Sequence, residues 1–397
     1  MNIKLSAGHQ EPNDAFDVPG FAPGGFADHT TALIRNCWYV AARSTDVCRD
    51  IMSRRLLGVD VALYRTLAGE VVAVRNRCPH RSFPLAKGKL VGDVLTCGYH
   101  GMQFDPSGRC VNMPAMPITP TNGNVRSFPV VERSPLVWIW MGDPDVADES
   151  LVPNTDWLSD PEWKSVGDTF HMKSDYVSMH ENLLDQTHFP FLHPGAIGTP
   201  EYARSRLKVS VERDVVVIYR ELRNSPPPGV YGVPTGTMGQ PVDRFSEARF
   251  VSPALHTAYA RIIDNKDRSG QPRTYRFNIT HVFTPETNGS IHYWWFCSRN
   301  FSLEDKAIDD HLYAASAKAY QEDVDALEWI LETVSSDTQP QFDLNFAPDK
   351  PGLLMRQILY RLAAGEAGQP GDNLCASAGE RAGQQPGQSS FEAKSFD

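Results

Sequence analysis

The sequence has no long apolar run and no excess of positive charge. Its longest uninterrupted apolar run, Leu136 to Met141, is far shorter than the roughly 20 residues of a membrane-spanning helix, so we expect no such helix. The first residues, Met1 to Phe16, are polar and show no secretory signal. Asp and Glu number 48 against 38 Lys and Arg, which gives a net charge of −10. This balance argues against a general nucleic-acid binder and against docking on anionic membranes.

A disulfide framework is not expected either. The seven cysteines are odd in number and widely scattered along the 397 residues. Without an export signal, this usage predicts a reduced chain in the cytoplasm. With 41% hydrophobic and 22% charged residues, the rest of the composition is that of an ordinary globular protein. The 7 Cys and 12 His are therefore the residue types to search for candidate functional sites.

The distribution of strand and turn residues divides the chain into four segments. Residues 1–34 show no clear period and are expected to form an arm. Residues 35–148 contain short β-branched and aromatic runs between Gly and Pro turns, which predicts an all-β domain. Residues 149–362 combine long strand candidates with late helices, so we expect an α+β domain with an antiparallel sheet. Residues 363–397 have almost no large apolar side chain, which predicts a disordered tail.

The α+β domain has recognisable elements. Strands are expected at 205–222, 257–264, 273–284 and 290–299. The Pro- and Gly-rich stretch 224–246 is interpreted as a lid or a loop at the mouth of a pocket. A long helix is expected from about Leu303 to Thr333, opened by a capping box of Ser302 and Asp305.

Two Cys–His pairs occur in the β domain, Cys78-Pro79-His80-Arg81 and Cys97-Gly98-Tyr99-His100-Gly101. The pairs could hold zinc, or they could be four unrelated core residues. A Rieske [2Fe–2S] cluster, with two Cys on one iron and two His on the other, explains more of the pattern. Pro and Gly beside the pairs permit the tight turns that bring two loops onto one cluster.

A second group of candidate ligands lies in the α+β domain, between Glu181 and His193. Asp185 and His188 are three residues apart and would share a helix face. His188 and His193 would point about 140° apart on an ideal helix. Pro190 breaks the helix between them, so both imidazoles can reach one point. The alternative is an amphipathic helix with incidental histidines.

Two His and one carboxylate form the facial triad of non-haem Fe(II) oxygenases. On a helical wheel of the late helix, Asp323 lies at the margin of the apolar stripe. It is our choice for the third ligand, and Asp309 is the second choice. The other acids of the helix point away or are intermediate: Asp310, Glu322, Asp325 and Glu328.

These motifs resemble those of the oxygenase (alpha) component of the Rieske non-haem iron aromatic oxygenases. Asn-x-x-Asp-x-x-His-x(4)-His with a later Glu-Asp-Val, placed after Cys-Pro-His-Arg and Cys-x-Tyr-His-Gly, is most similar to the vanillate O-demethylase and dicamba monooxygenase group. The likeness covers about residues 35–350 and leaves out the arm and the tail.

The resemblance implies a Rieske domain followed by a helix-grip (START-like) catalytic domain, in a homotrimer. It implies a [2Fe–2S] cluster bound by Cys78, His80, Cys97 and His100, and a mononuclear Fe(II) bound by His188, His193 and Asp323. In this scheme Asp185 bridges His100 of one chain and His188 of its neighbour, and Asn182 lines the iron site.

The implied reaction uses O₂ to hydroxylate or to O- or N-dealkylate an aromatic carboxylate or aryl ether. Because the chain has no Gly-x-Gly-x-x-Gly fingerprint, electrons from NAD(P)H would come through a separate reductase of the FMN/[2Fe–2S] type, or through a ferredoxin and its reductase. The alternatives are a dioxygenase that forms cis-diols and a zinc-stabilised binding or scaffolding protein.

His281 is the one candidate substrate contact. It lies on the apolar face of the strand 273–284, as either a core histidine or a donor to an anionic or phenolic substrate. A matching histidine in dicamba monooxygenase favours the second interpretation. In a chain of charge −10, an anionic substrate needs a local donor such as His281 or an arginine.

Overall fold

The computed structural model describes residues 33–119, 121–133, 135–265, 270–337 and 344–367. Almost all of the expected arm and most of the expected tail lie outside these residues. No helix in the described ranges is long and apolar enough to cross a bilayer.

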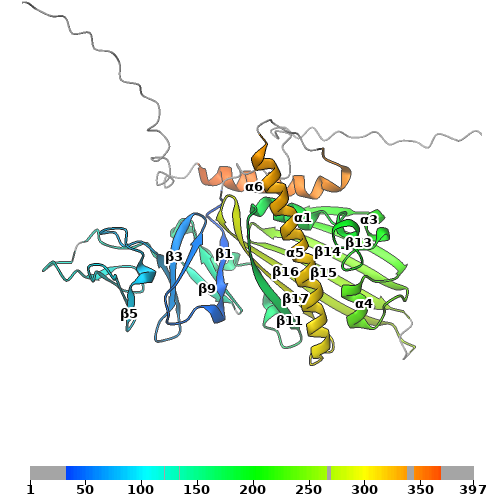
Figure 1. Ribbon diagram of the computed structural model, residues 1–397, viewed down its shortest axis with the longest axis horizontal. Helices are drawn as coiled ribbons and strands as arrows, with labels where there is room; N and C mark the ends of the chain where they lie inside the picture. Colours follow the sequence, from blue (N-terminus) through cyan, green and yellow to red (C-terminus); the bar gives the residue numbers. More distant parts are fainter. Residues whose placement is uncertain (1–32, 120, 134, 266–269, 338–343, 368–397) are drawn as a thin grey trace, which may run out of the picture.

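The N-terminal part of the described chain is an all-β domain, drawn from blue to cyan in Figure 1. Two three-stranded antiparallel sheets have the orders β1-β10-β9 and β2-β3-β4. β1, β3, β4, β9 and β10 form in β-branched and aromatic runs of the kind from which the sequence predicts strands, whereas β2, with the sequence MSRRL, is too polar to be recognised. The bounds are β1 (Trp38–Arg43), β2 (Met52–Leu56), β3 (Val59–Arg65), β4 (Val71–Arg75), β9 (Val130–Arg133) and β10 (Leu136–Trp140).

A small four-stranded sheet, with the order β5-β6-β7-β8, carries the two Cys–His loops. One loop precedes this sheet and the other joins β6 to β7. Each strand has two or three residues, too few for an alternation to be recognised in the sequence. The bounds are β5 (Lys89–Val91), β6 (Val94–Thr96), β7 (Gln103–Phe104) and β8 (Cys110–Asn112).

The second domain is built on a seven-stranded antiparallel sheet with the order β11-β17-β16-β15-β14-β13-β12. The segment expected as one strand at 205–222 is two strands, because the chain turns at Arg213, whose φ is 56°. The bounds are β11 (Lys164–Met172), β12 (Lys208–Glu212), β13 (Val215–Ser225), β14 (Val242–Ser252), β15 (Leu255–Asp264), β16 (Arg273–Thr287) and β17 (Ser290–Arg299).

The helices of the second domain pack on one face of this sheet, and Figure 1 shows α5 crossing it. The sequence and the structure agree on the α+β class and on a β domain followed by a sheet with helices. The α-helices are α1 (Tyr176–Leu184), α2 (Phe189–Leu192), α3 (Pro200–Arg204), α4 (Gly229–Thr235), α5 (Lys306–Ser336) and α6 (Lys350–Ala367). The 3₁₀ turns span Ser44–Asp46, Leu85–Lys87, Pro144–Val146, Glu149–Leu151, Asp156–Leu158 and Ala347–Asp349.

Three expectations about these elements were wrong. The stretch 224–246 is not one loop, since it contains α4 and the start of β14. The capping box does not form, because Asp305 alone caps α5 and Ser302 has a φ of 46°. α6 runs through Ala367, past the boundary expected at residue 362.

The opposite face of the sheet packs on the β domain. Thr284 on β16 donates its hydroxyl to the carbonyl oxygen of Val40 (2.6 Å), and the Leu57 N–H donates to the Pro285 carbonyl oxygen (2.7 Å). Trp138 and Trp294 belong to one apolar core shared by the two domains. This shared core fixes the Cys–His loops relative to the catalytic sheet.

Burial of His180 on α1 predicts sensitivity to acid. The side chain is fully buried between Phe250 and Phe283, and burial lowers its pKa to about 4. From about pH 6.5 down to about 4, His180 is protonated in the unfolded chain but stays neutral in the folded protein. The free energy of unfolding therefore falls as the pH falls, by up to about 1.4 kcal/mol per pH unit.

We therefore expect His180→Phe to flatten the loss of stability between about pH 7 and 5, measured by chemical denaturation. His171→Phe is the control, because His171 is exposed and pairs with Glu286. An unchanged slope in His180→Phe would show that other groups cause the acid sensitivity.

Candidate active site

The segment between α1 and α2 positions the first two candidate ligands. α1 ends at Leu184, and Asp185 is extended with φ −89° and ψ 104°. The chain turns before His188 and starts α2 at Phe189, with Pro190 in its first turn, where proline is tolerated. The break is therefore earlier than expected from Pro190, but it has the expected effect of bringing His188 and His193 together.

His188, His193 and Asp323 converge, with one ligand atom from each residue within 4.8 Å of the others. His193 Nε2 lies 3.0 Å, and His188 Nε2 3.5 Å, from Asp323 Oδ1. The His193 side chain is fully buried and that of Asp323 is almost so. Thus α5 and the α1–α2 segment, more than 100 residues apart in the chain, meet at the predicted point.

Two polar side chains hold this group in place. His193 Nδ1 lies 2.8 Å from Glu322 Oε2, and donation from Nδ1 to this oxygen leaves Nε2 available to bind a metal ion. Asn182 Nδ2 donates to Asp323 Oδ1 (3.1 Å). The expectation that Glu322 points away was wrong, because the wheel considers α5 alone and not the loop beside it.

The other acids of α5 have different roles. Asp309, the second choice, forms an ion pair with the buried Arg299. Glu328 accepts from the backbone N–H of Lys173 (2.8 Å) and so fixes the start of the chain that leads to α1. Among the candidate carboxylates on α5, Asp323 is therefore the one that joins both histidines.

The donor set fits a divalent metal ion. Burial raises the pKa of Asp323, but the two nearby imidazoles of His188 and His193 outweigh it and bring the pKa down to about 2. His188 Nε2 and Asn182 Oδ1 are buried without hydrogen-bond partners, although buried polar atoms are normally paired. Two imidazoles and one carboxylate with open positions match the ligand type of non-haem Fe(II).

Asp185 lies beside this group at the surface. Its Oδ1 accepts from the N–H (2.8 Å) and the hydroxyl (2.5 Å) of Thr187, and its Oδ2 lies 3.5 Å from His188 Nδ1. The Asp185 side chain is 19% exposed, so one side of the carboxylate is fixed and another side faces outward.

The two Cys–His loops also meet. Cys78 and Cys97 are buried, whereas His80 and His100 are exposed with ring centroids 4.5 Å apart. The loops close alike, since the Ser82 N–H donates to the Cys78 carbonyl oxygen (2.9 Å) and the Gly101 N–H to that of Cys97 (3.1 Å). Burial raises the pKa of the Cys78 thiol, while the N–H groups of His80 and Arg81 oppose this rise.

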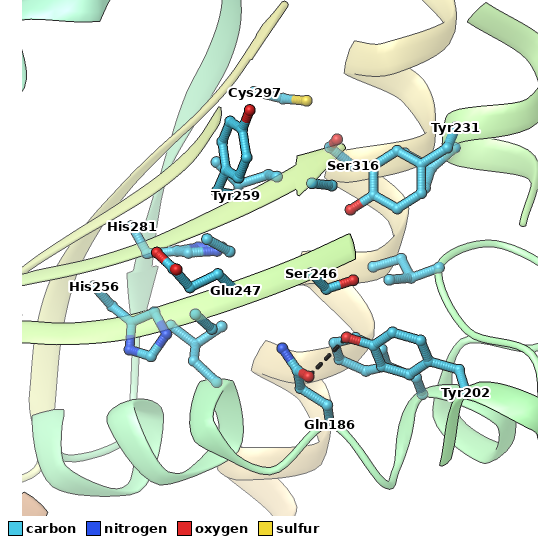
Figure 2. A pocket seen from close by; sticks show the side chains of 18 of the residues that line it. Gln186, Tyr202, Tyr231, Ser246, Glu247, His256, Tyr259, His281, Cys297 and Ser316 are labelled. Carbon is cyan, nitrogen blue, oxygen red and sulfur yellow. Dashed lines mark hydrogen bonds between the residues drawn. The ribbon is translucent and has the colours of Figure 1, made fainter. Parts of the chain in front are cut away.

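A cavity opens beside Asp323 between the sheet and the helices. Its wall includes apolar side chains and, as Figure 2 shows, His256, His281, Ser246 and the hydrogen-bonded pair Tyr202 and Gln186. His281 Nδ1 bonds to the Tyr293 hydroxyl (2.7 Å), and burial lowers the His281 pKa to about 3, so the ring is neutral. His281 is thus part of the packed core and also part of the cavity wall.

Comparison with known proteins identifies the family. The Rieske [2Fe–2S] domain family matches residues 37–129, and the vanillate O-demethylase oxygenase C-terminal domain family matches residues 172–365. The iron–sulfur subunit of the toluene-4-sulfonate monooxygenase system of Comamonas testosteroni is 38% identical over 315 residues, which cover 76% of this chain and 90% of that protein. The chain belongs to the Rieske non-haem iron oxygenases.

Dicamba O-demethylase supplies a second comparison for this Rieske oxygenase. The oxygenase component from Stenotrophomonas maltophilia is 37% identical over 301 residues, covering 72% of this chain and 84% of that protein. A crystal structure of dicamba monooxygenase bound to 3,6-dichlorosalicylic acid aligns with a TM-score of 0.80 at 30% identity, over 85% of this chain and all of that one. Another, which holds non-haem iron and dicamba, aligns with a TM-score of 0.71 at 29% identity.

These relatives fix the general activity. They are named as a subunit of a monooxygenase system and as the oxygenase component of a demethylase, so this Rieske oxygenase is an oxygenase component that works with a separate reductase. The dioxygenase alternative is not favoured, and a zinc-stabilised scaffold does not account for the matches to a Rieske [2Fe–2S] domain and to an oxygenase domain.

Two polar residues of the cavity wall were missed by sequence reasoning. His256 pairs with His281 across β15 and β16, so both side chains lie on the same face. Arg244 lies on β14, in the segment interpreted as a loop. A strand assignment over 242–248 would have shown Arg244 alternating inward with Ser246 and Ala248.

The Glu322–His193 contact predicts a role in metal affinity. Glu322→Ala should weaken Fe(II) binding about 10- to 100-fold, because the orientation of the His193 ring is no longer fixed. Glu322→Gln should keep most of the affinity, since an amide oxygen can still accept. Asp325→Ala is the control on the same helix, where Asp325 accepts from Gln321. Competition with a ferrous chelator measures the affinity, and a wild-type value in Glu322→Ala would contradict the role.

Proposed function

We propose that the protein hydroxylates or dealkylates an aromatic substrate at an iron held by His188, His193 and Asp323. The convergence of these three buried ligand atoms within 4.8 Å carries the proposal. Bound there, Fe(II) would supply the site at which O₂ is activated. Cys78, His80, Cys97 and His100 would hold the [2Fe–2S] cluster that delivers electrons.

The protein residues around the iron have separate tasks. Glu322 fixes the ring of His193, and Asn182 fixes one oxygen of Asp323. The rings of His281 and His256 line the cavity that reaches Asp323, and both rings are neutral because they are buried. The Nε2 atom of His188, which has no hydrogen-bond partner, lies 3.5 Å from Asp323 Oδ1 and is available to the metal.

The cavity favours an aromatic substrate. Phe189, Tyr231 and Ile279 give it apolar and aromatic walls, against which a planar ring packs well. Since relatives over most of the chain are named for toluene-4-sulfonate and dicamba, we extend this class to aromatic acids and aryl ethers. His281 would contact such a substrate.

The proposed electron path runs between subunits of a trimer. In Figure 1, β5 lies at the end of the β domain away from α1, so the cluster loops of one chain point away from its own iron site. Exposed apolar side chains occur near both sites: Tyr99 (62%) and Ile118 (76%) near the loops, and Phe191 (85%) between the two histidines. Such patches mark interaction surfaces. Asp185 would join His188 to His100 of the neighbouring chain.

The reductase is proposed to be of the FMN/[2Fe–2S] type, or a ferredoxin with its own reductase. The six described cysteines are free, which fits the reducing cytoplasm where NAD(P)H is found.

Turnover with a purified reductase tests the function. We expect O₂ uptake that depends on an aromatic acid or aryl ether, with formaldehyde released from methyl ethers. His188→Ala should lose turnover yet keep the colour of the cluster, whereas the exposed His171→Ala should retain both. Full turnover in His188→Ala, a cis-diol as the main product, or a colourless protein without acid-labile sulfide would contradict the proposal.

Mixed oligomers test the path between subunits. Cys97→Ser lacks a cluster and His188→Ala lacks the iron, so each variant alone should be inactive. Co-expressed and purified as mixed trimers, they should regain turnover, because an intact cluster then lies beside an intact iron in the next chain. Mixed trimers that stay inactive would place the electron path within one chain. Light scattering gives the oligomeric state.

A further inference from the structure

Two buried arginines in the catalytic domain lack carboxylate partners. Arg220 on β13 is 2% exposed and Arg244 on β14 is 3% exposed, and neither forms an ion pair among the described residues. The other two buried arginines of the described chain do, since Arg299 pairs with Asp309 and Arg356 with Glu181. A buried cation costs several kcal/mol unless it is paired, so the first two need an explanation.

Neutral groups surround the Arg244 guanidinium. Its Nη2 donates to the hydroxyls of Thr199 (3.1 Å) and Ser225 (3.2 Å), while its Nε has no partner. Its Cζ atom lies 6.0 Å from the centroid of the Tyr202 ring. These contacts satisfy two N–H groups but supply no negative charge. Burial lowers the pKa of Arg244, and exposed Glu201 opposes this only from a distance.

Arg220 adds a second positive charge on the other side of Tyr202. Its Nη1 donates to the Ser205 carbonyl oxygen (2.7 Å), its guanidinium lies 5.5 Å from the Tyr202 ring, and its Nε has no partner. Asp185 affects its pKa only at longer range. Tyr202 itself donates to Gln186 Oε1 (2.7 Å), as the dashed line in Figure 2 shows. The described residues thus place two cations around this ring, and neither has a carboxylate within ion-pair distance.

Arg244 lines the same cavity as Asp323 and lies close to the segment that carries the two candidate histidine ligands. The Tyr202 ring beside Arg244 stacks on the Phe189 ring, with centroids 5.8 Å apart. The Phe189 ring in turn lies 5.9 Å from the ring of His193. The cavity therefore has a cationic side and an iron-binding side, and only two aromatic rings separate Arg244 from His193.

We propose that Arg244, with Arg220 behind it, binds the anionic group of the aromatic substrate. The group is a carboxylate or a sulfonate, and the carbon that is oxidised lies at the opposite end of the ring, toward Asp323. This inference rests on the proposed oxygenase function and names the substrate class. An oxyanion supplies the missing counter-charge and forms charge-assisted hydrogen bonds with the free guanidinium N–H groups. It also explains how a chain of charge −10 accepts an anion.

Ligand binding without turnover tests this assignment. Isothermal titration of the holoprotein, with no reductase present, compares benzoate and benzenesulfonate with the neutral isosteres benzamide and benzenesulfonamide. We expect the anions to bind at least about tenfold more tightly, because a neutral amide leaves the buried charge unpaired. Tighter binding of benzoate indicates a carboxylate substrate, and tighter binding of benzenesulfonate a sulfonate. Equal binding of anions and isosteres, or no binding of either anion, would overturn the proposal.

Variants of Arg244 make the test specific. Arg244→Gln should abolish the preference for anions, and Arg244→Lys should retain part of it. Arg249→Gln is the control, because Arg249 is exposed on the same strand and pairs with Glu247. A preference for anions that persists in Arg244→Gln would overturn the proposal.

Thermal melting separates binding from a structural role. Without ligand, Arg244→Gln should melt no lower than the wild type, since it removes an unpaired buried charge. It should also lose the rise in melting temperature that benzoate gives the wild type. If Arg244→Gln melts far below the wild type, Arg244 is structural and the proposal is wrong. O₂ uptake tests the oxygenase function separately, so either idea can fail alone.

Discussion

The rest of the catalytic domain depends on the convergence of two imidazoles on one buried carboxylate. Asp323 Oδ1 lies 3.0 Å from His193 Nε2, 3.1 Å from Asn182 Nδ2 and 3.5 Å from His188 Nε2. This convergence requires α1 to end at Leu184, α2 to begin after His188 and α5 to lie over the sheet at a position where Asp323 reaches both rings. Ending one helix and starting another interrupts the backbone hydrogen bonds of a continuous helix. Glu322 and Glu328 offset this loss with hydrogen bonds that join α5 to the chain after α1 and before α1.

The sequence alone was enough to choose three side chains that converge, His188, His193 and Asp323, but not the groups that support them. Asp323 could be chosen because burial of α5 leaves a periodic apolar stripe, and one acid lies at its margin. Glu322 could not, since its contact with His193 joins two elements whose relative position appears in no local pattern. Arg244 and His256 were missed for the same reason, as their inward direction depends on strand register. The strands of the small sheet are too short to leave a pattern at all.

The buried arginines of the catalytic domain fall into two groups, those paired with a carboxylate and those without such a partner. Where a buried arginine supports structure, as Arg299 does at the start of α5, a carboxylate accompanies it. Arg244, the buried arginine that lines the cavity, has no carboxylate within ion-pair distance. The shared core between the domains, with Trp138 and Trp294, then holds the cluster loops at the outer end of the β domain.

Counting iron in a single variant tests the central claim most directly. The wild type and Asp323→Ala would be incubated anaerobically with Fe(II), desalted, and assayed for total iron and for cluster absorbance. The account predicts that Asp323→Ala loses the mononuclear iron and keeps the full absorbance of the [2Fe–2S] cluster. Equal iron content in the two proteins would show that Asp323 does not bind the metal, and would contradict the account.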